Sequence, residues 1–202
     1  MTSSPDRHAQ RRAATRQKLI DAIRALIFQK GYSQVDILDI TERANVSRGA
    51  FYIHFKGKED CVRAVMEQGF DALVEEISGS KPAFPSRPEW ALRSLTRLFQ
   101  WADENRALLT VMVGGTVSPE LNTFGRDYMT RVIKRNIMED PVLLEQSQPH
   151  RYPADVLAQI VTGMVIQALG WWLDQETGHT PEQMGRILRD IVFYGVTPRG
   201  EE

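Results

Sequence analysis

The sequence predicts an all-α protein of about nine helices, because apolar residues recur at spacings of three and four along most of the chain. No segment shows the apolar–polar alternation of a strand, and no internal repeat competes with the helical pattern. Segments rich in proline, glycine and serine, such as residues 79–88, separate the helical segments. With 202 residues and 42% hydrophobic content, the chain can bury a core as one domain or as two closely packed ones.

Start and stop signals place the helices along the chain. Gly31 ends the first helix, Pro88 lies near the first turn of the fifth, and Gly114 ends the sixth. Thr180, followed by Pro181 and by Gln183 in capping-box register, begins the last helix. The expected ranges are 15–30, two short helices within 36–55, then 58–77, 90–102, 108–113, 120–138, 154–176 and 181–194.

Residues 36–55 are the most informative stretch, because they fit two short helices joined by a tight turn. Asp36 is suited to cap the first helix, and Ser47 is suited to cap the second. Asn45 lies where the chain must turn sharply, and asparagine tolerates the left-handed conformation better than most residues. This layout is that of a helix-turn-helix DNA reader.

The second short helix carries a small, polar outer face. Phe51 and Phe55 point inward, whereas Arg48 and Tyr52 point outward to read base edges or thymine methyls. Lys58 opens the next helix, where its charge could bind a phosphate. The candidate DNA-contacting residues are Ser33, Asp36, Ser47, Arg48, Gly49, Ala50, Tyr52, His54 and Lys58.

The run from Gly31 through A-N-V-S-R-G-A-F-Y-I-H-F to K-G-K-E-D closely resembles the DNA-binding domain of the TetR family of transcriptional repressors. The resemblance covers roughly residues 15–65. The chain departs from the family pattern in having Asn45 for the turn glycine, Asp36 where a threonine is common, and Ile53 between the tyrosine and the histidine. The resemblance implies an effector cavity enclosed by the helices after the fourth, and a homodimer formed through the last two helices.

Charge and composition divide the chain into a basic head and an acidic body. Residues 1–60 hold 11 Lys/Arg and 7 Asp/Glu, a net charge of +4, which leaves −5 for the rest. We expect a disordered basic arm over residues 1–13, a helix-turn-helix domain over 14–60, and an effector-binding and dimerisation domain over 61–202. The arm carries Arg7, Arg11 and Arg12. It is expected either to be a solvated tail or to contact DNA phosphates or the minor groove.

Bulky and apolar residues of the body suggest both a ligand site and an interface. Flat rings and flexible thioethers suit the lining of an apolar pocket, although any one of them could simply be core. The candidate ligand-binding residues are Phe99, Met112, Phe124, Tyr128, Met164 and Trp171. The segment 154–176 is apolar nearly all round, which favours a partner subunit as its cover; the alternative is an internal core helix.

Several classes of function lack support. No catalytic or phosphate-loop motif is present, the four histidines are scattered, and no cofactor or metal is expected. The single cysteine, Cys61, and the absence of a signal-peptide pattern favour the cytoplasm. The longest apolar run, residues 160–173, is shorter than the roughly 18 residues needed to span a bilayer, so no membrane partner is expected.

These observations favour a homodimeric regulator that binds palindromic double-stranded operator DNA and is released by a small apolar or aromatic effector. The alternative is a helical ligand-binding or protein-interaction protein that has lost DNA binding. Loss of DNA binding would leave the fold intact but remove salt-dependent affinity for DNA.

Overall fold

The computed structural model describes residues 4–79, 86–113, 118–135, 152–175 and 177–196, and within these ranges the chain is helical, with nine α-helices and no strand. The predicted all-α class is therefore confirmed. The α-helices are α1 (Ser4–Lys30), α2 (Ile37–Ala44), α3 (Arg48–His54), α4 (Lys58–Gly79), α5 (Arg87–Glu104), α6 (Arg106–Val113), α7 (Pro119–Ile133), α9 (Ala154–Asp174) and α10 (Pro181–Tyr194). A short 3-10 turn, η1 (Tyr32–Gln34), connects α1 to α2.

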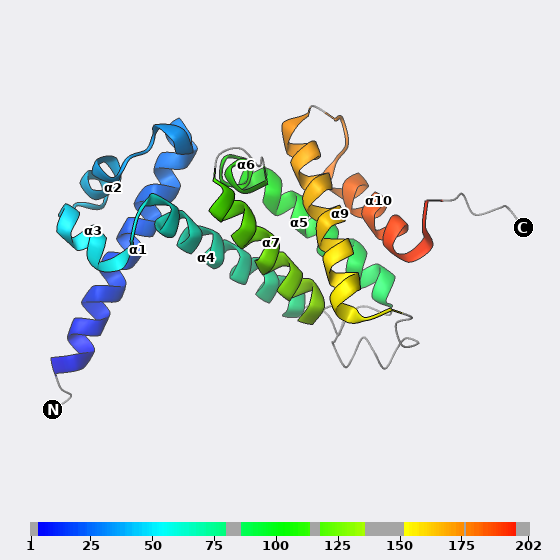
Figure 1. Ribbon diagram of the computed structural model, residues 1–202, viewed down its shortest axis with the longest axis horizontal. Coiled ribbons are helices and arrows are strands. Elements are labelled where there is room, and N and C mark those ends of the chain that lie inside the picture. Colours follow the sequence, from blue (N-terminus) through cyan, green and yellow to red (C-terminus); the bar gives the residue numbers. More distant parts are fainter. Residues whose placement is uncertain (1–3, 80–85, 114–117, 136–151, 176, 197–202) are drawn as a thin grey trace, which may run out of the picture.

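The two ends of the molecule differ in build. Helices α1, α2 and α3 form one end, α5 to α10 form the other, and α4 runs between them (Figure 1). Along α4, Cys61, Val62 and Val65 are fully buried, and Phe70 and Leu73 are nearly so. Because one continuous helix contributes to the cores of both ends, a shift of α4 changes how the two ends are placed.

The helix-turn-helix part is built from well-capped short elements. Asp36 accepts a hydrogen bond from the Asp39 backbone N–H at 2.8 Å, and Asp39 accepts one from the Asp36 N–H, which together form a capping box. Asn45 adopts the expected left-handed conformation with φ 53°. The Ser47 hydroxyl accepts a hydrogen bond from the Ala50 N–H at 3.1 Å. The sequence therefore predicted this turn correctly.

Helix α1 begins much earlier than predicted. The expected disordered arm over residues 1–13 is wrong for residues 4–13, which belong to α1; residues 1–3 lie outside the described part of the chain. Arginine, alanine and glutamine all have good helix propensity, and residues 7–18 contain neither glycine nor proline. The missing apolar stripe suggested a coil, whereas the local propensity continues the helix that begins in the core.

The body is a set of helices in tight contact. Helix α10 packs along α5, where a Cβ atom added to Gly185 would lie 2.5 Å from the Thr96 hydroxyl and 2.8 Å from the Thr96 backbone nitrogen. Helix α7 packs against α9, and the Thr130 and Thr162 hydroxyls are 3.2 Å apart. The capping box of Thr180 and Gln183 at the start of α10 is present as predicted. Helix α7 ends at Ile133, earlier than the predicted end at Met138, which lies outside the described part.

Helix α9 is the most apolar element. It has 21 residues, and its most apolar stretch of 18 residues has a mean hydropathy of 1.6, so by length and composition alone it could cross a membrane; 33% of that stretch is buried. The apolar run of residues 160–173 lies within this helix, whose start at Ala154 is the one that the sequence predicted. A core or interface helix can have the same composition.

Candidate DNA-binding face and ligand cavity

The outer face of α3 presents the residue types that the sequence predicted. Phe51 is fully buried and Phe55 is 3% exposed, so the two rings anchor α3 to the core. Tyr52 is 56% exposed and Arg48 is exposed one turn earlier. A Cβ atom added to Gly49 would meet only the Ser47 hydroxyl, at 3.8 Å, so packing within the chain does not require this glycine. The face is therefore free to approach a partner closely.

The flanking candidates have structural roles as well. Asp36 and Ser47 are exposed but both cap helices, and Ser33 is exposed on η1. The Lys30 ammonium lies 2.7 Å from the Asp39 carboxylate. This hydrogen bond is the main reason why the pKa of Asp39 is lowered. Asp36 is thus held in position by the capping box, and its carboxylate adds negative charge to this face.

His54 lies at the C-terminal end of α3, next to α1. It is half-buried, and its pKa is lowered first by burial and then by the nearby charges of Arg12 and Arg16. The Arg16 guanidinium carbon lies 5.1 Å from the centre of the Phe55 ring. His54 is therefore less open than Tyr52, and the arginines of α1 are its neighbours.

Lys58 does not present its charge to solvent as predicted. Its ammonium donates hydrogen bonds to the carbonyl oxygens of Tyr32, at 3.1 Å, and Val35, at 2.9 Å. It also lies 4.0 Å from the centre of the Tyr32 ring. The Tyr32 hydroxyl in turn donates to Glu59 at 2.6 Å. The side chain fastens η1 to the start of α4, so a phosphate contact by this ammonium is not what the structure supports.

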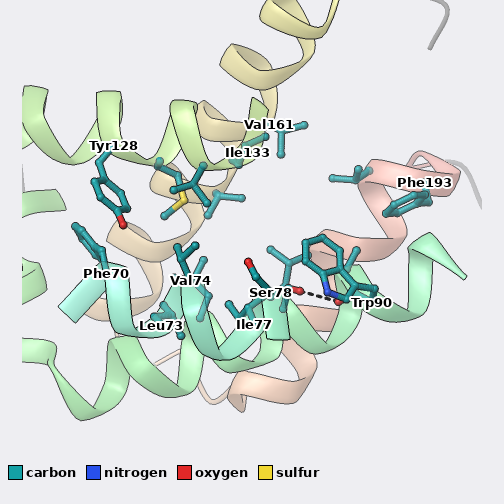
Figure 2. Close-up of a pocket in the computed structure, with 18 residues that line it drawn as sticks. Phe70, Leu73, Val74, Ile77, Ser78, Trp90, Tyr128, Ile133, Val161 and Phe193 are labelled. Carbon is teal, nitrogen blue, oxygen red and sulfur yellow. Dashed lines mark hydrogen bonds between the residues drawn. The ribbon is translucent and has the colours of Figure 1, made fainter. Parts of the chain in front are cut away.

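The body contains an apolar cavity of about 110 Å³, which is partly open to the surface (Figure 2). Five helices contribute, namely the C-terminal half of α4, the N-terminal half of α5, and parts of α7, α9 and α10. The lining residues are Phe70, Leu73, Val74, Ile77, Ser78, Trp90, Ala91, Ser94, Leu95, Leu98, Tyr128, Met129, Val132, Ile133, Val161, Val165, Val192 and Phe193. None of these residues carries a formal charge at neutral pH, so the cavity suits an apolar occupant.

Of the five predicted ligand residues whose side chains the structure describes, only Tyr128 lines this cavity. Phe124 lies beside it, with ring centres 6.1 Å apart. Phe99 is fully buried against Trp172, at 5.3 Å between ring centres, and so belongs to the core. Trp171 is 46% exposed, and Met164 is half-buried outside the lining. The Met112 side chain lies outside the described part of the structure.

Tyr128 connects the cavity to α4. Its hydroxyl donates a hydrogen bond to the Asp71 carboxylate at 2.6 Å, and its ring centre is 5.0 Å from that of Phe70. The pKa of Tyr128 is raised, chiefly by burial and then by this hydrogen bond. Because Tyr128 is on α7 and both partners are on α4, a ligand that moves the ring acts directly on α4.

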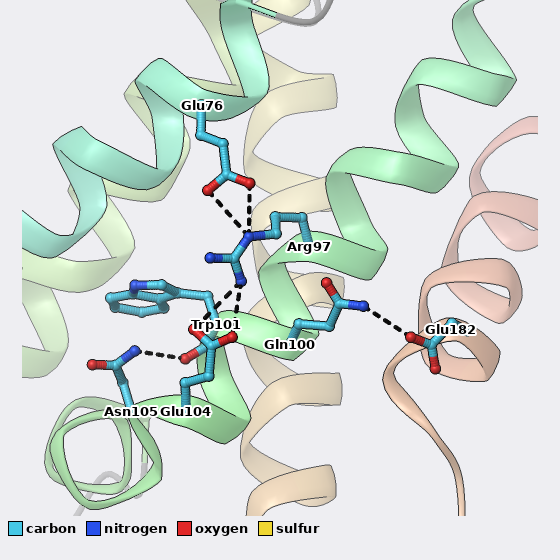
Figure 3. A network of polar contacts seen from close by, with 7 residues as sticks. All are labelled: Glu76, Arg97, Gln100, Trp101, Glu104, Asn105 and Glu182. Carbon is cyan, nitrogen blue, oxygen red and sulfur yellow. Dashed lines mark hydrogen bonds and ion pairs between the residues drawn. The ribbon is translucent and has the colours of Figure 1, made fainter.

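A second set of contacts holds α4 against α5 (Figure 3). The Arg97 Nε donates to both oxygens of Glu76, at 2.9 and 3.1 Å, and Nη1 lies 3.4 Å from Glu104. The hydrogen bond to Glu76 is the main reason why the pKa of Arg97 is raised. Nearby, Gln100 donates to Glu182 at 2.9 Å, which joins α5 to the start of α10. Glu76, Arg97 and Gln100 also line a polar hollow next to the apolar cavity, and Ile77 and Ser94 line both.

Among the described residues, no group of three or more histidine, cysteine, aspartate or glutamate side chains could hold a metal ion. Cys61 is buried on α4, and burial raises the pKa of its thiol to about 12. The buried thiol therefore stays protonated at neutral pH and is a packing residue.

Comparison with known proteins identifies the two ends of the molecule separately. Residues 19–65 match the family model described as bacterial regulatory proteins of the tetR family. Residues 91–194, more than half of the chain, match a model described as a transcriptional regulator C-terminal region. The chain belongs to the TetR family. It is therefore a transcriptional regulator, and the family consists of regulators rather than enzymes.

Individual relatives agree over most of the chain. The regulator AcrR of Shigella flexneri is 33% identical over 171 residues, which is 79% of this chain and 78% of that protein. FadR of Thermus thermophilus in complex with lauroyl-CoA has a TM-score of 0.73 at 16% identity, covering 91% of this chain and 96% of that chain. RolR in complex with resorcinol has a TM-score of 0.69 at 22% identity, covering 94% and 98%. At these identities the solved structures establish the fold.

The sequence did not predict several residues of the two sites. More than half of the residues that line the cavity are leucine, isoleucine and valine, contributed by all five helices, and any helical core contains these residue types. On α3, Ile53 is 63% exposed and lies next to Tyr52, although an isoleucine on a short helix normally points inward. Its position between Tyr52 and His54, both of which the sequence predicted to point outward, was the available signal.

Proposed function

We propose that this regulator is a repressor that binds a palindromic operator as a homodimer and leaves the operator when an apolar small molecule fills the body cavity. The observation that carries the proposal is the position of α4. Its first residue, Lys58, binds the helix-turn-helix end of the molecule (α1 to α3, the reader), and Phe70, Leu73 and Ile77 further along line the cavity. A single rigid helix thus connects the two sites. The ordinary location for such a regulator is the cytoplasm.

The DNA contact is assigned to the outer face of α3. Arg48 supplies donors that match a guanine edge, and Tyr52 with Ile53 supplies apolar surface for thymine methyls. Gly49 and Ala50 keep the N-terminal end of the helix narrow, and Ser47 contributes a hydroxyl next to a phosphate. In place of the occupied Lys58, the exposed Lys56 is the lysine available for a phosphate contact in this loop.

The dimer contact is assigned to α9 and α10, at the end of the molecule away from the reader (Figure 1). Val156, Ile160 and Trp171 are 50%, 59% and 46% exposed and share one face of α9 with Gly163. Helix α10 adds Ile187, which is 41% exposed. An apolar face of this extent is unusual for a monomer, and a two-fold partner presenting the same face would cover it.

The cavity favours a hydrocarbon chain over a polar ring. Two of the three hydroxyl groups in its lining are already engaged, since Ser94 donates to the Trp90 carbonyl at 2.8 Å and Tyr128 donates to Asp71; Ser78 supplies the third. A diol such as resorcinol, the ligand of RolR, would bury two hydroxyls among mainly apolar side chains. An acyl chain such as that of lauroyl-CoA, the ligand of FadR, makes no such demand.

Operator binding is tested by selecting bound duplexes from a random-sequence pool and measuring their affinity by fluorescence anisotropy. Arg48→Ala should weaken the selected operator by about 1 to 3 kcal/mol, that is roughly 5- to 150-fold, if Arg48 reads a base pair. Arg126→Ala, an exposed arginine on α7, is the matched control and should bind like the parent. The selected sequences should have dyad symmetry.

A parent protein that shows no salt-dependent binding to any duplex would contradict this proposal. It would favour the alternative, a helical ligand-binding or protein-interaction protein that has lost DNA binding.

Effector binding is tested with lauroyl-CoA and with resorcinol as the contrasting probe. Lauroyl-CoA should change the fluorescence of Trp90, which lines the cavity, and should release the operator. Ala91→Phe, which places a ring in the cavity, should abolish both effects of lauroyl-CoA. If resorcinol acts and lauroyl-CoA does not, the assigned ligand class is wrong; if a bound ligand strengthens operator binding, the ligand is a co-repressor.

A further inference from the structure

The first turns of α1 form a basic ridge that the helix-turn-helix motif does not include. Residues 7–18 contain Arg7, Arg11, Arg12, Arg16 and Lys18 and no aspartate or glutamate. At 100° per residue, all five cations fall within one half of the helix circumference. Arg7, Arg11 and Arg12 are exposed and make no ion pair with any residue in the described part of the chain.

The ridge lies next to α3. Arg12 and Arg16 are close enough to His54, at the end of α3, to lower its pKa, and Arg16 stacks on Phe55. Arg12 and Arg16 also lie at helical spacing with Leu19, Ile23 and Ile27, which α1 buries in the domain core. The face that packs on the domain therefore changes from apolar to basic where α1 extends past α3 (Figure 1).

Arg12 continues the core-facing stripe beyond the domain, and Arg7 and Arg11 lie about 100° to 140° around the helix from it. All three are exposed, so none of them has a packing role within the chain. The extension from Arg16 to Arg7 is roughly 13 Å long at 1.5 Å per residue. This corresponds to about four base pairs of DNA at 3.4 Å each. Guanidinium groups suit phosphate oxygens because their donors form a planar fork.

We propose that residues 7–16 of α1 are a rigid second DNA-binding element, which holds the phosphate backbone that flanks the base pairs contacted by α3. The inference rests on the proposed binding of DNA by α3. It assigns to a helix the role that a flexible arm could also have. The helix is already ordered by its continuation into the core, so binding loses little conformational entropy.

The test compares three proteins on the selected operator over a range of salt concentrations. In the triple variant Arg7→Gln, Arg11→Gln, Arg12→Gln the log–log salt slope should become shallower by about 0.9 for each phosphate that is no longer neutralised, counted on both protomers. Arg126→Gln on α7 is the control and should leave the slope unchanged. Circular dichroism should show that all variants keep their helices, because the altered side chains are exposed.

Two further measurements are needed. The first tests whether residues 7–16 act as a rigid helix or as a flexible arm, and the second tests whether they contact the flanks or the centre of the operator. Ala13→Pro keeps every arginine but breaks α1 ahead of its buried residues, and it should weaken binding as much as the triple variant does. Ala13→Gly should have a smaller effect of the same sign. Removing four base pairs from each end of the operator should weaken the parent but not the triple variant.

An unchanged salt slope in the triple variant overturns the proposal. A parent-like affinity of Ala13→Pro also overturns it, because a flexible arm would then suffice. The proposal is likewise wrong if the parent and the triple variant lose the same affinity on the shortened duplex. If the parent binds no duplex, the proposed function itself is wrong. This outcome differs from a failure of the further inference, in which the parent binds the operator and the variants bind it equally well.

Discussion

The reader and the body of this regulator are both helical, but different forces define them. In the reader, α2 and α3 have 8 and 7 residues, and caps at Asp36, Asn45 and Ser47 define where they begin and end. In the body, five helices meet around a cavity whose walls come from residues as far apart as Phe70 and Phe193. The reader is a tightly packed surface for presenting α3, whereas the body keeps internal space. Substitutions should therefore have different effects in the two regions.

The largest contrast should appear on removing a phenylalanine from each region. Phe51→Ala removes a fully buried ring from the reader core and should destabilise the protein by about 3 to 5 kcal/mol. Phe193→Ala removes a half-buried ring that faces the cavity, and it should cost clearly less because much of its surroundings are already empty. Urea denaturation of both variants and the parent measures the difference. Equal destabilisation would show that the cavity wall is packed as tightly as the reader.

A second contrast uses two glycines of the body. Gly185→Ala would place a Cβ atom 2.8 and 2.9 Å from the Thr96 backbone N and Cα, which cannot move aside easily, and should destabilise by about 1 to 3 kcal/mol. Gly163→Ala has open space and should stabilise the monomer by up to about 1 kcal/mol, since glycine disfavours a helix interior. Thermal unfolding gives both signs. A neutral Gly185→Ala would mean that α10 can move away from α5.

A third comparison sets the two capping boxes against each other. Asp36→Ala in the reader and Thr180→Ala in the body should each cost about 0.5 to 2 kcal/mol, because each leaves helix N–H groups without an acceptor. Only the reader cap should affect operator affinity, since it positions α2 beneath α3. Anisotropy measured well below the melting temperature separates binding from stability. If Thr180→Ala also weakens operator binding, the two regions are coupled through α10 rather than α4.

The same difference explains what the sequence could predict. Caps and turns are local, so Asp36, Asn45, Ser47 and Thr180 were recognised within a few residues and were confirmed. Phe51 and Phe55 were also placed correctly, because a helix of 7 residues has few ways to bury two rings.

Properties that depend on distant parts of the chain could not be predicted in this way. The cavity depends on how α4, α5, α7, α9 and α10 pack together, so residue type alone favoured bulky side chains such as Phe99, which belongs to the core. Lys58 was expected to face a phosphate, but the carbonyls of Tyr32 and Val35, more than twenty positions earlier, bind it instead. Spacing along the helix contained no information on these partners.

The smallest expected effect on stability, and the most informative effect on function, belongs to Tyr128. Tyr128→Phe keeps the ring packed on Phe70 but removes the hydrogen bond to Asp71. The free energy of unfolding should fall by no more than about 0.5 to 1.5 kcal/mol. Asp71 is exposed, and water can replace the tyrosine hydroxyl, so the melting temperature should hardly change. The function should change more, because this bond holds α4 against α7.

Without the bond, less of the ligand's binding energy is needed to move α4, so lauroyl-CoA should release the operator at a lower concentration from Tyr128→Phe than from the parent. The matched variant Asp71→Asn keeps an acceptor for the tyrosine and should lie between the two. Linkage requires the operator to weaken ligand binding by the same factor by which the ligand weakens operator binding, typically about 5- to 150-fold, and Tyr128→Phe should obey the same equality. Identical release curves for Tyr128→Phe and the parent would show that the ligand acts on α4 through the apolar wall of Leu73 and Ile77 rather than through this hydrogen bond.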